Sequence, residues 1–433
     1  MPDKREFTGK NKMTTIKKIS DIRGIGKLTT EAVRGITYLV EDLHQTILSL
    51  NGILDSPYKQ HTTGVTGMVY RNIRTVTELV GNEMDIALNK IIAMIESKNS
   101  DPLSLPISIP LYEAFISALN GIIGDHLVAS ENPLAINMRL RQNGVALSID
   151  KESFSDDDAL LNQIIESNGK IALMVHGLCM NDLQWNRQGH DHGAELSRDF
   201  GYTPVYLHYN TGLHISENGK AFSEIMEKFI NQISNSIMDK PIEIVIVAHS
   251  MGGLVSRSGF YYGKLANHTW LKHVKKLICL GTPHHGSPLE RFGNLIDMFL
   301  EINPYSSPFS RLGKIRSSGV TDLRYGNILE DDWKEQGRFE YSNDSRLPVS
   351  LPKDIDCYAV AVTTIKDSCT IANNLVGDGL VPLNSALGYH ENPDFNLLFP
   401  DNHKWVGNNM NHMDLLNGQE VYQTIKQWVA IKD

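Results

Sequence analysis

The first hundred residues carry apolar side chains at helical spacing. Apolar residues recur three and four positions apart from Glu31 to Leu50, and a second, longer set does so from Val65 to Met94. Each set forms a single apolar stripe, which predicts two amphipathic helices separated by a break. A Pro-rich linker is expected over residues 101–110 and a third helix over residues 111–123. We therefore expect a helical N-terminal region over residues 1–130, and its role stays open.

The apolar stripes of these helices need a covering surface. They could pack on the rest of the chain or on another copy of it, giving a homo-oligomer, or they could act as a lid or contact a membrane peripherally. The polar faces are mixed in charge. Interfacial helices are biased toward Lys and Arg, so the mixed charge favours packing over membrane contact.

Beyond residue 130 the pattern changes to short apolar runs alternating with helical ones. Two runs flank Asn143-Gly144, which predicts a β-hairpin. Strands are expected at 171–175, 204–209, 242–247, 276–280 and 358–363, and helices at 194–200, 221–238 and 420–429. The alternation predicts an α/β fold over residues 131–433, a mostly parallel sheet flanked by helices with its ligand site at the carboxyl ends of the strands.

Residues 282–356 are too many for a simple crossover between two strands. Their apolar and aromatic content predicts a cap insertion, with Phe292 among the residues that would contact a substrate. The alternative is that these apolar residues pack only on one another.

Composition narrows the classes of function. The chain has 433 residues, enough for one large domain and an additional one, and a formal net charge of −9 with 21% charged residues. No basic stripe is present, so a nucleic-acid partner is not expected. The four cysteines have no Cys-x-x-Cys spacing, which disfavours metal clusters and a disulfide framework. No secretory signal or membrane-spanning run is evident, and we expect a cytoplasmic protein.

The segment from Pro241 to Gly253 contains the strongest chemical signal. A β-branched run leads into Ala248-His249-Ser250-Met251-Gly252-Gly253, and an apolar helix follows. A serine in a tight turn between strand and helix is held in a cramped conformation with its hydroxyl above the sheet edge. Ser250 is therefore the candidate nucleophile. The Met251 amide, at the start of the helix, is a candidate oxyanion donor.

A serine nucleophile needs an imidazole to remove its proton and a carboxylate to orient that imidazole. His412 lies after the last predicted strand and just before the last helix, which favours it as the base over its rival His403. Asp378 lies in a Gly-Asp-Gly loop that Pro382 ends, after the strand at 358–363. Asp367 comes first after that strand but lacks such loop chemistry, so Asp378 is favoured as the acid.

These motifs resemble the α/β-hydrolase family, in particular the bacterial lipases, carboxylesterases and GPI inositol deacylase-like hydrolases. The resemblance covers about residues 130–433 and includes His176-Gly177-Leu178, the turn at Ser250, Asp378 and Asn411-His412 in the family's order. Ala248 stands where the family usually has glycine. The resemblance implies that the Leu178 amide is the second oxyanion donor and that His176, Gly177 and His249 lie at the substrate site.

The sequence predicts a serine ester hydrolase without a cofactor, acting on a small-molecule or lipid ester. Amide hydrolysis or acyl transfer on the same three residues, and a non-catalytic scaffold built on the N-terminal helices, are the alternatives. No metal is predicted. Neither zinc at Gly189-His190-Asp191-His192 nor calcium near Asp414 has an identifiable full ligand set in the sequence.

Overall fold

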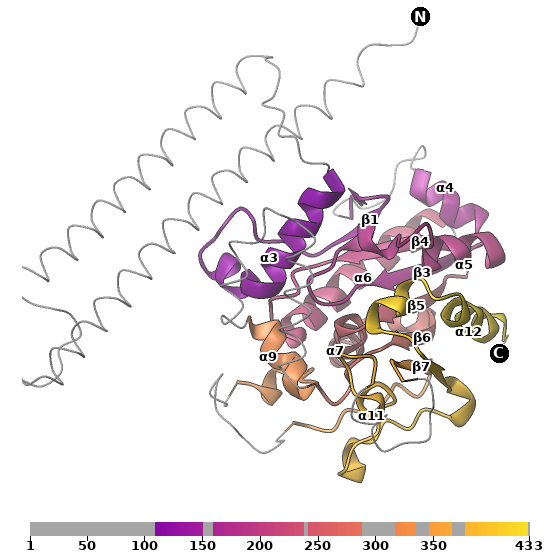
Figure 1. Cartoon of the computed structure of the whole chain (residues 1–433). Coiled ribbons are helices and arrows are strands. Elements are labelled where there is room, and N and C mark those ends of the chain that lie inside the picture. Colours follow the sequence, from indigo (N-terminus) through magenta and orange to yellow (C-terminus); the bar gives the residue numbers. More distant parts are fainter. Residues whose placement is uncertain are drawn as a thin grey trace, which may run out of the picture. The chain divides into compact units, whose positions relative to one another are not determined.

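The computed structural model describes residues 109–149, 159–237, 241–287, 317–334, 346–365 and 377–431, drawn in colour in Figure 1. The two predicted N-terminal helices and most of the predicted linker lie outside these ranges. The chain divides into two compact units. Described residues 127–135 belong to the first, and all other described residues belong to the second, which contains the whole sheet.

An eight-stranded sheet forms the centre of the described part, in the order β2-β1-β4-β3-β5-β6-β7-β8. The strands are β1 (Arg139–Gln142), β2 (Val145–Ala146), β3 (Lys170–Val175), β4 (Thr203–His208), β5 (Glu243–His249), β6 (Val274–Leu280), β7 (Asp356–Thr363) and β8 (Lys404–Asn408). Strand β1 pairs antiparallel with β2 and β4, and every other neighbouring pair is parallel. The prediction of a mostly parallel α/β sheet is therefore confirmed.

The predicted hairpin is present as β1 and β2. Its two turn residues, Asn143 and Gly144, have φ values of 51° and 75°. Two consecutive residues with positive φ match the twist of an antiparallel pair, and Asn-Gly adopts this conformation readily. The hairpin adds the antiparallel edge to a sheet whose other strands need helical crossovers.

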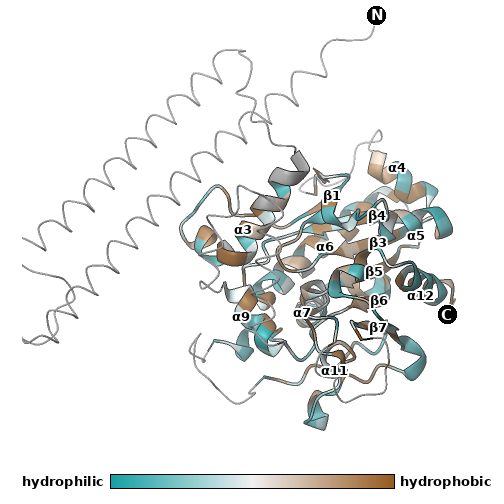
Figure 2. Cartoon of the chain, viewed as in Figure 1, coloured by the Kyte–Doolittle hydropathy of each residue, from teal (hydrophilic) through white to brown (hydrophobic). Residues whose placement is uncertain are grey.

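Helices cover both faces of the sheet. They are α3 (Ile109–Ala129), α4 (Ala159–Glu166), α5 (His192–Phe200), α6 (Ile215–Ile237), α7 (Met251–Leu265), α9 (Ser318–Tyr325), α11 (Leu383–Ala386) and α12 (Gln419–Ala430). Figure 1 shows α5 and α12 on one face and α6 and α7 on the other. In Figure 2 the central strands are largely hydrophobic, whereas α5 and α12 show many hydrophilic residues. The core thus lies between the sheet and its helices.

Helices α6 and α7 approach each other closely because glycines face the contact. A Cβ on Gly259 would lie 2.4 Å from Cδ1 of Phe222, and one on Gly219 would lie 2.1 Å from Oγ of Ser258. Real Cβ atoms do not come this close, so any larger residue would push the helices apart. Helix α7 carries Ser250 at its start, and this packing fixes its position over the sheet.

The third predicted helix is observed as α3, longer than expected and with non-helical dihedrals at Ile123. A Cβ on Gly121 would lie 2.3 Å from Sγ of Cys179, and one on Gly124 would lie 1.9 Å from Oδ1 of Asn210. This part of α3 therefore packs against loops of the sheet-containing unit. The boundary at residue 130 stays a prediction. Elements α4, α9, α11 and β8 were not predicted.

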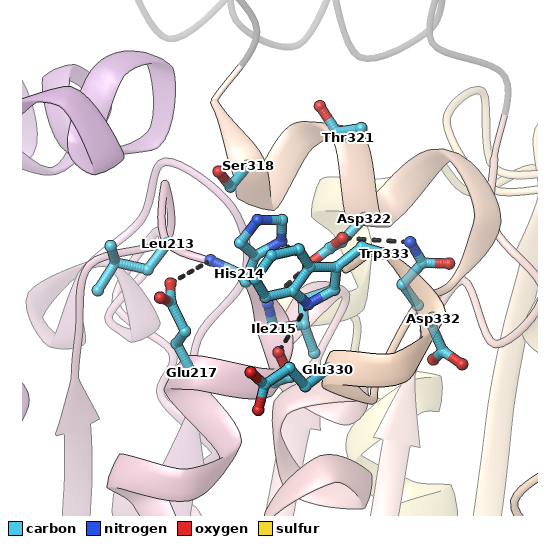
Figure 3. A network of polar contacts seen from close by, with 12 residues as sticks. Leu213, His214, Ile215, Glu217, Ser318, Thr321, Asp322, Glu330, Asp332 and Trp333 are labelled. Carbon is cyan, nitrogen blue, oxygen red and sulfur yellow. Dashed lines mark hydrogen bonds and ion pairs between the residues drawn. The ribbon is translucent and has the colours of Figure 1, made fainter. Parts of the chain in front are cut away.

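Part of the predicted cap insertion is described, and it includes α9. Figure 3 shows how α9 is attached to the start of α6: His214 Nδ1 and the Ile215 amide each donate to Asp322 Oδ2 at 2.9 Å. The Trp333 ring stacks on His214 with centroids 3.6 Å apart, and its Nε1 donates to Ser216 Oγ at 3.0 Å. Phe292 lies outside the described residues, so its predicted contact with a substrate stays a prediction.

Two further observations concern helix length and cysteine chemistry. Within the described ranges, no helix combines the length and apolarity needed to cross a bilayer. Cys179, Cys279 and Cys357 are buried free thiols. Burial raises the pKa of the thiols of Cys179 and Cys279 to about 12, so all three side chains serve as small apolar core residues.

Candidate functional site

Ser250 lies in the turn between β5 and α7 with φ 53° and ψ −122°. This conformation is rare for a residue with a side chain and is maintained only where the surroundings enforce it. The Ser250 amide donates to the Leu280 carbonyl at 2.8 Å, and a Cβ on Gly252 would lie 2.4 Å from the Val175 carbonyl oxygen. The ends of β3 and β6 thus hold the turn in its strained form, as the sequence predicted for a nucleophile.

Asp378 and His412 form a buried pair. His412 Nδ1 donates to Asp378 Oδ2 at 2.7 Å, and the His412 amide donates to the Asp378 carbonyl at 3.1 Å. The other carboxylate oxygen, Oδ1, accepts from the amides of Leu380 and Val381 at 2.9 and 2.8 Å. The carboxylate is therefore fixed by its own loop. Because Nδ1 must carry the proton in this bond, Nε2 of a neutral His412 is left as the basic nitrogen.

Gly281 lies between the serine turn and the Asp378–His412 pair. It follows Leu280, whose carbonyl holds the Ser250 amide, and a Cβ on it would lie 3.1 Å from His412 Cε1 and 3.2 Å from Asp378 Oδ2. Its φ of 58° also favours glycine. The structure thus brings the three predicted residues to one edge of the sheet. A hydrogen bond from Ser250 Oγ to His412 Nε2 is not among those formed by the described residues.

The His176-Gly177-Leu178 segment follows β3 and lies against the serine turn. A Cβ on Gly177 would lie 3.0 Å from both Ser250 Cβ and His249 Nδ1. No described residue accepts a hydrogen bond from the Leu178 amide. The first N–H groups of a helix likewise lack intrahelical acceptors, and Met251 is the first residue of α7. Both amides predicted as oxyanion donors thus lie in segments adjoining Ser250.

The His176 side chain stabilises the loop that follows β3. Its ring stacks on Tyr209 with centroids 4.4 Å apart, its Nδ1 donates to the Gly177 carbonyl at 2.9 Å, and the Tyr209 hydroxyl donates to the His176 carbonyl at 2.7 Å. Burial lowers the pKa of His176 to about 4. A neutral, fully enclosed ring with these contacts orders the loop, and the predicted substrate contact of His176 stays untested.

His249 connects the nucleophile to the base. Its Nε2 donates to the His412 carbonyl at 3.3 Å, and the two rings lie 4.7 Å apart. Burial, and then the neighbouring His412, hold the pKa of His249 well below its ordinary value. The neutral ring positions the backbone of His412. Its predicted role in substrate binding is not tested by these contacts.

The competing candidates occupy other positions. His403 donates from Nδ1 to the Cys357 carbonyl at 3.2 Å and stacks on Tyr358. These contacts hold His403 against β7 and not at the serine turn. Asp367 lies outside the described residues. Asp414 accepts from the Asn411 amide at 2.8 Å and caps the 3-10 turn His412–Leu416. This cap helps orient His412, a role that the sequence reasoning missed although Asn-x-x-Asp is a capping pattern.

His190 and His192, the histidines of the candidate zinc segment, are hydrogen-bonded to each other. His190 Nε2 and His192 Nδ1 are 2.8 Å apart, and His192 Nε2 donates to the Leu415 carbonyl at 2.9 Å. Because that nitrogen carries the proton, Nδ1 of a neutral His192 accepts from His190. Within the described residues, no group of three His, Cys, Asp or Glu side chains is arranged to hold a metal ion.

One stretch of the chain is similar to a known protein family. Residues 166–356 match the family described as the PGAP1-like alpha/beta domain. This stretch is therefore similar to that family. Together with the sheet order, it gives the chain an α/β-hydrolase fold. The matched stretch includes β3 to β6 and therefore Ser250 and both candidate oxyanion donors, whereas Asp378 and His412 lie beyond it.

Solved structures resemble the chain at low sequence identity. The mature lipase BlEst2 of Bacillus licheniformis is 19% identical, with 61% of this chain and 93% of that chain covered and a TM-score of 0.38. Lipase B of Aspergillus fumigatus is 11% identical, with 62% and 53% covered and a TM-score of 0.36. An alpha/beta hydrolase fold protein from Chitinophaga pinensis is 9% identical, with 61% and 90% covered and a TM-score of 0.32. No curated protein matches the chain.

Proposed function

We propose that the protein is a serine ester hydrolase, a carboxylesterase or lipase, with Ser250 as nucleophile, His412 as general base and Asp378 as the acid that orients it. The observation that carries the proposal is the strained backbone of Ser250 at the strand–helix turn, with φ 53° and ψ −122°. Strain of this kind costs free energy and is retained where it exposes a reactive group.

The Asp378–His412 pair supports the same assignment. The Leu380 and Val381 amides engage Oδ1, which leaves Oδ2 to accept from His412 Nδ1. This arrangement holds the imidazole in the tautomer whose Nε2 can remove the serine proton, and it stabilises the imidazolium that forms. The motif order Ser, Asp, His along the chain is that of α/β hydrolases.

The reaction would proceed through an acyl-enzyme. Ser250 Oγ attacks the ester carbonyl while His412 takes its proton, and the amides of Leu178 and Met251 stabilise the oxyanion. His412 then protonates the leaving alcohol and activates a water molecule that releases the acid. Removing one oxyanion donor typically costs about 3 to 4 kcal/mol of transition-state stabilisation. The loop at Gly177 must therefore hold its position beside Ser250 during the reaction.

A fluorophosphonate probe tests the nucleophile directly. We expect covalent labelling of the full-length protein, with the label mapped by mass spectrometry to the peptide containing Ser250 and lost in Ser250→Ala. Label on another serine would refute the assignment. The absence of labelling together with the absence of ester turnover would favour the non-catalytic scaffold.

A second assay identifies the reaction class. Turnover of a p-nitrophenyl ester should greatly exceed that of the p-nitroanilide with the same acyl group. Faster cleavage of the anilide would show an amidase. Transfer of the acyl group to an added alcohol in preference to water would show an acyltransferase.

A further inference from the structure

The loop that follows β4 contacts the segment carrying the Leu178 amide at two points. The Tyr209 hydroxyl donates to the His176 carbonyl at 2.7 Å, and the Cys179 amide donates to Thr211 Oγ1 at 3.1 Å. These two contacts lie on either side of the Leu178 amide along the chain. The loop after β4 therefore holds the segment at both ends.

The segment itself forms a tight turn. The Met180 amide donates to the Gly177 carbonyl at 3.3 Å, which closes a four-residue turn with Leu178 and Cys179 at its centre. Cys179, the third residue of the turn, has a φ of 60°. A positive φ at this position defines a type II turn, where glycine or asparagine is usual, and it is rare for a residue with a larger side chain. The surroundings must therefore stabilise a conformation that cysteine does not favour.

The hydrogen bond to Thr211 supplies part of this stabilisation. Type I and type II turns differ by a rotation of the peptide group between the two central residues, and only the type II form has a positive φ at the third residue. In this turn that peptide group carries the Cys179 amide, so the rotation would direct its N–H away from Thr211 Oγ1. Cys179 is fully buried, and its N–H would lose this partner without gaining water. The Thr211 acceptor thus opposes relaxation of the strained turn.

Thr211 is buried, and its neighbours fix its position. Asn210 Oδ1 accepts from the Gly212 amide at 3.0 Å, and Asn210 Nδ2 donates to the Gly124 carbonyl of α3 at 3.1 Å. Asn218 Nδ2, from α6, donates to the Asn210 carbonyl at 2.9 Å. Because two helices hold this loop, the Thr211 side chain can impose a conformation on the turn.

The conformation of the turn matters because the turn lies against the nucleophile. A Cβ on Gly177 would lie 3.0 Å from Ser250 Cβ. A donor stabilises an oxyanion only from about 2.7 to 3.1 Å, so a rotated peptide group next to Leu178 would move its N–H out of range.

We propose that Thr211 is a positioning residue for ester hydrolysis, which holds the Leu178 N–H where the oxyanion forms, and that Tyr209 has the same role at the other end of the segment. This inference rests on the proposed serine hydrolase function. Each hydroxyl group acts through the backbone group that it contacts and not on the substrate.

The substitution Thr211→Val removes the acceptor and keeps the shape of the side chain. Loss of one oxyanion donor lowers kcat by about 10² to 10³-fold, so a displaced donor should lower kcat by about 10- to 100-fold. KM for the p-nitrophenyl ester should change little, because the contact is made mainly in the transition state. Thr211→Ser restores the acceptor and should restore most of the lost kcat.

Thr203→Val is the matched control. Thr203 begins β4, at the opposite end of that strand from Thr211, is also buried, and donates from Oγ1 to the Gln163 carbonyl at 3.1 Å. The same substitution there should lower the thermal stability and leave kcat unchanged. Equal losses of kcat in Thr203→Val and Thr211→Val would show a general effect of stability and would overturn the proposal.

A trifluoromethyl ketone with the acyl group of the ester tests the oxyanion contact directly. Ser250 Oγ adds to the ketone carbon, His412 takes the serine proton, and the carbonyl oxygen becomes an oxyanion that needs the same donors. Its inhibition constant should rise in Thr211→Val by the factor by which kcat/KM falls. An inhibition constant that stays at the wild-type value would contradict the positioning role.

Fluorophosphonate labelling separates failure of this inference from failure of the proposed function. If the wild-type protein is labelled at Ser250 and hydrolyses the ester, but Thr211→Val keeps the wild-type kcat, only the positioning role is wrong. If the wild-type protein is neither labelled nor active, the proposed function fails and the positioning role fails with it.

A second variant keeps the inference testable if Thr211→Val does not fold by circular dichroism. Tyr209→Phe removes the hydroxyl that donates to the His176 carbonyl and keeps the ring that stacks on His176. It should lower kcat at nearly constant KM and raise the inhibition constant of the ketone. Wild-type values of kcat and of the inhibition constant in Tyr209→Phe would overturn the proposal.

Discussion

The substitution Asp378→Asn isolates the role of the carboxylate at the candidate site. In the wild-type protein, Oδ1 accepts from the amides of Leu380 and Val381, and Oδ2 accepts from His412 Nδ1. An asparagine must keep its oxygen toward the two amides, because its NH₂ group cannot accept from them. The NH₂ group then faces His412 and donates to Nδ1, which moves the imidazole proton to Nε2. That tautomer cannot remove the serine proton.

The expected loss of activity is large although the shape is conserved. In the serine-protease triad the same change lowers turnover on the order of 10⁴-fold, which corresponds to about 5.4 kcal/mol of activation free energy. We expect a similar fall in kcat for p-nitrophenyl ester hydrolysis by Asp378→Asn. The Leu380 and Val381 hydrogen bonds persist, so thermal unfolding should change little in comparison.

The chain offers a matched control in the His214–Asp322 pair of Figure 3. Asp322 Oδ2 accepts from His214 Nδ1 at 2.9 Å, and Asp322 is as buried as Asp378, but the pair attaches α9 to α6 and has no predicted chemical role. Asp322→Asn should lower the free energy of unfolding by about 1 to 3 kcal/mol and leave kcat within a few-fold. Asp367→Asn should be nearly silent. An Asp378→Asn enzyme within tenfold of wild type, or a larger loss in Asp367→Asn, would refute the assignment of the acid.

Three further predictions concern the triad, acid stability and the N-terminal region. Ser250→Ala, His412→Ala and the double variant should have similar residual ester turnover, because triad members act as a unit; a double variant far slower than either single would contradict this. Burial lowers the pKa of His192 from 6.5 to about 3. The free energy of unfolding should therefore fall as the pH drops from 6.5 toward 3, because the unfolded chain binds this proton first. For this one group the fall is up to about 1.4 kcal/mol per pH unit. His192→Gln should reduce that slope in thermal melts, and an unchanged slope would exclude His192. A chain starting at Asn132 loses α3 and should aggregate on size-exclusion chromatography, because its removal exposes apolar surface. If this shortened chain is instead a soluble monomer and the full-length chain binds liposomes, packing by the N-terminal region is refuted.

The serine turn could be predicted because its signal is local. The β-branched strand, the small residues and the following helix are all within about a dozen positions, and each has a direct steric meaning. Asp378 and His412 could be proposed because loop chemistry and chain order restrict where an acid and a base can follow. The strands predicted at 171–175, 204–209, 242–247, 276–280 and 358–363 and the helices predicted at 194–200 and 420–429 are observed within two residues of their expected bounds. Helices α3 and α6 each extend six residues beyond the predicted bounds at one end.

Features that depend on tertiary contacts were not predicted. Strand β8 lies at the sheet edge and is only partly buried, so its sequence lacks a continuous apolar run. Nothing in the sequence reveals that His412 and Asp378 pack against Gly281. The hydrogen bond between Arg257 and His284 likewise joins residues 27 positions apart that meet only in the folded chain.

The parallel register of the sheet explains why the site residues meet. Strand β5 ends at His249, β6 ends at Leu280, and the loops bearing Asp378 and His412 follow β7 and β8, so all four loops leave the same edge of the sheet. Each loop then fixes its own side chain by local contacts: strain at Ser250, two amides at Asp378, and the Asn411–Asp414 cap beside His412. Local sequence therefore sets the orientation of each group, whereas strand register sets the distances between them. A shift of one residue in the β5–β6 pairing would break the Ser250–Leu280 hydrogen bond and move the nucleophile about 3.3 Å relative to its neighbours, more than a proton transfer between hydrogen-bonded groups tolerates.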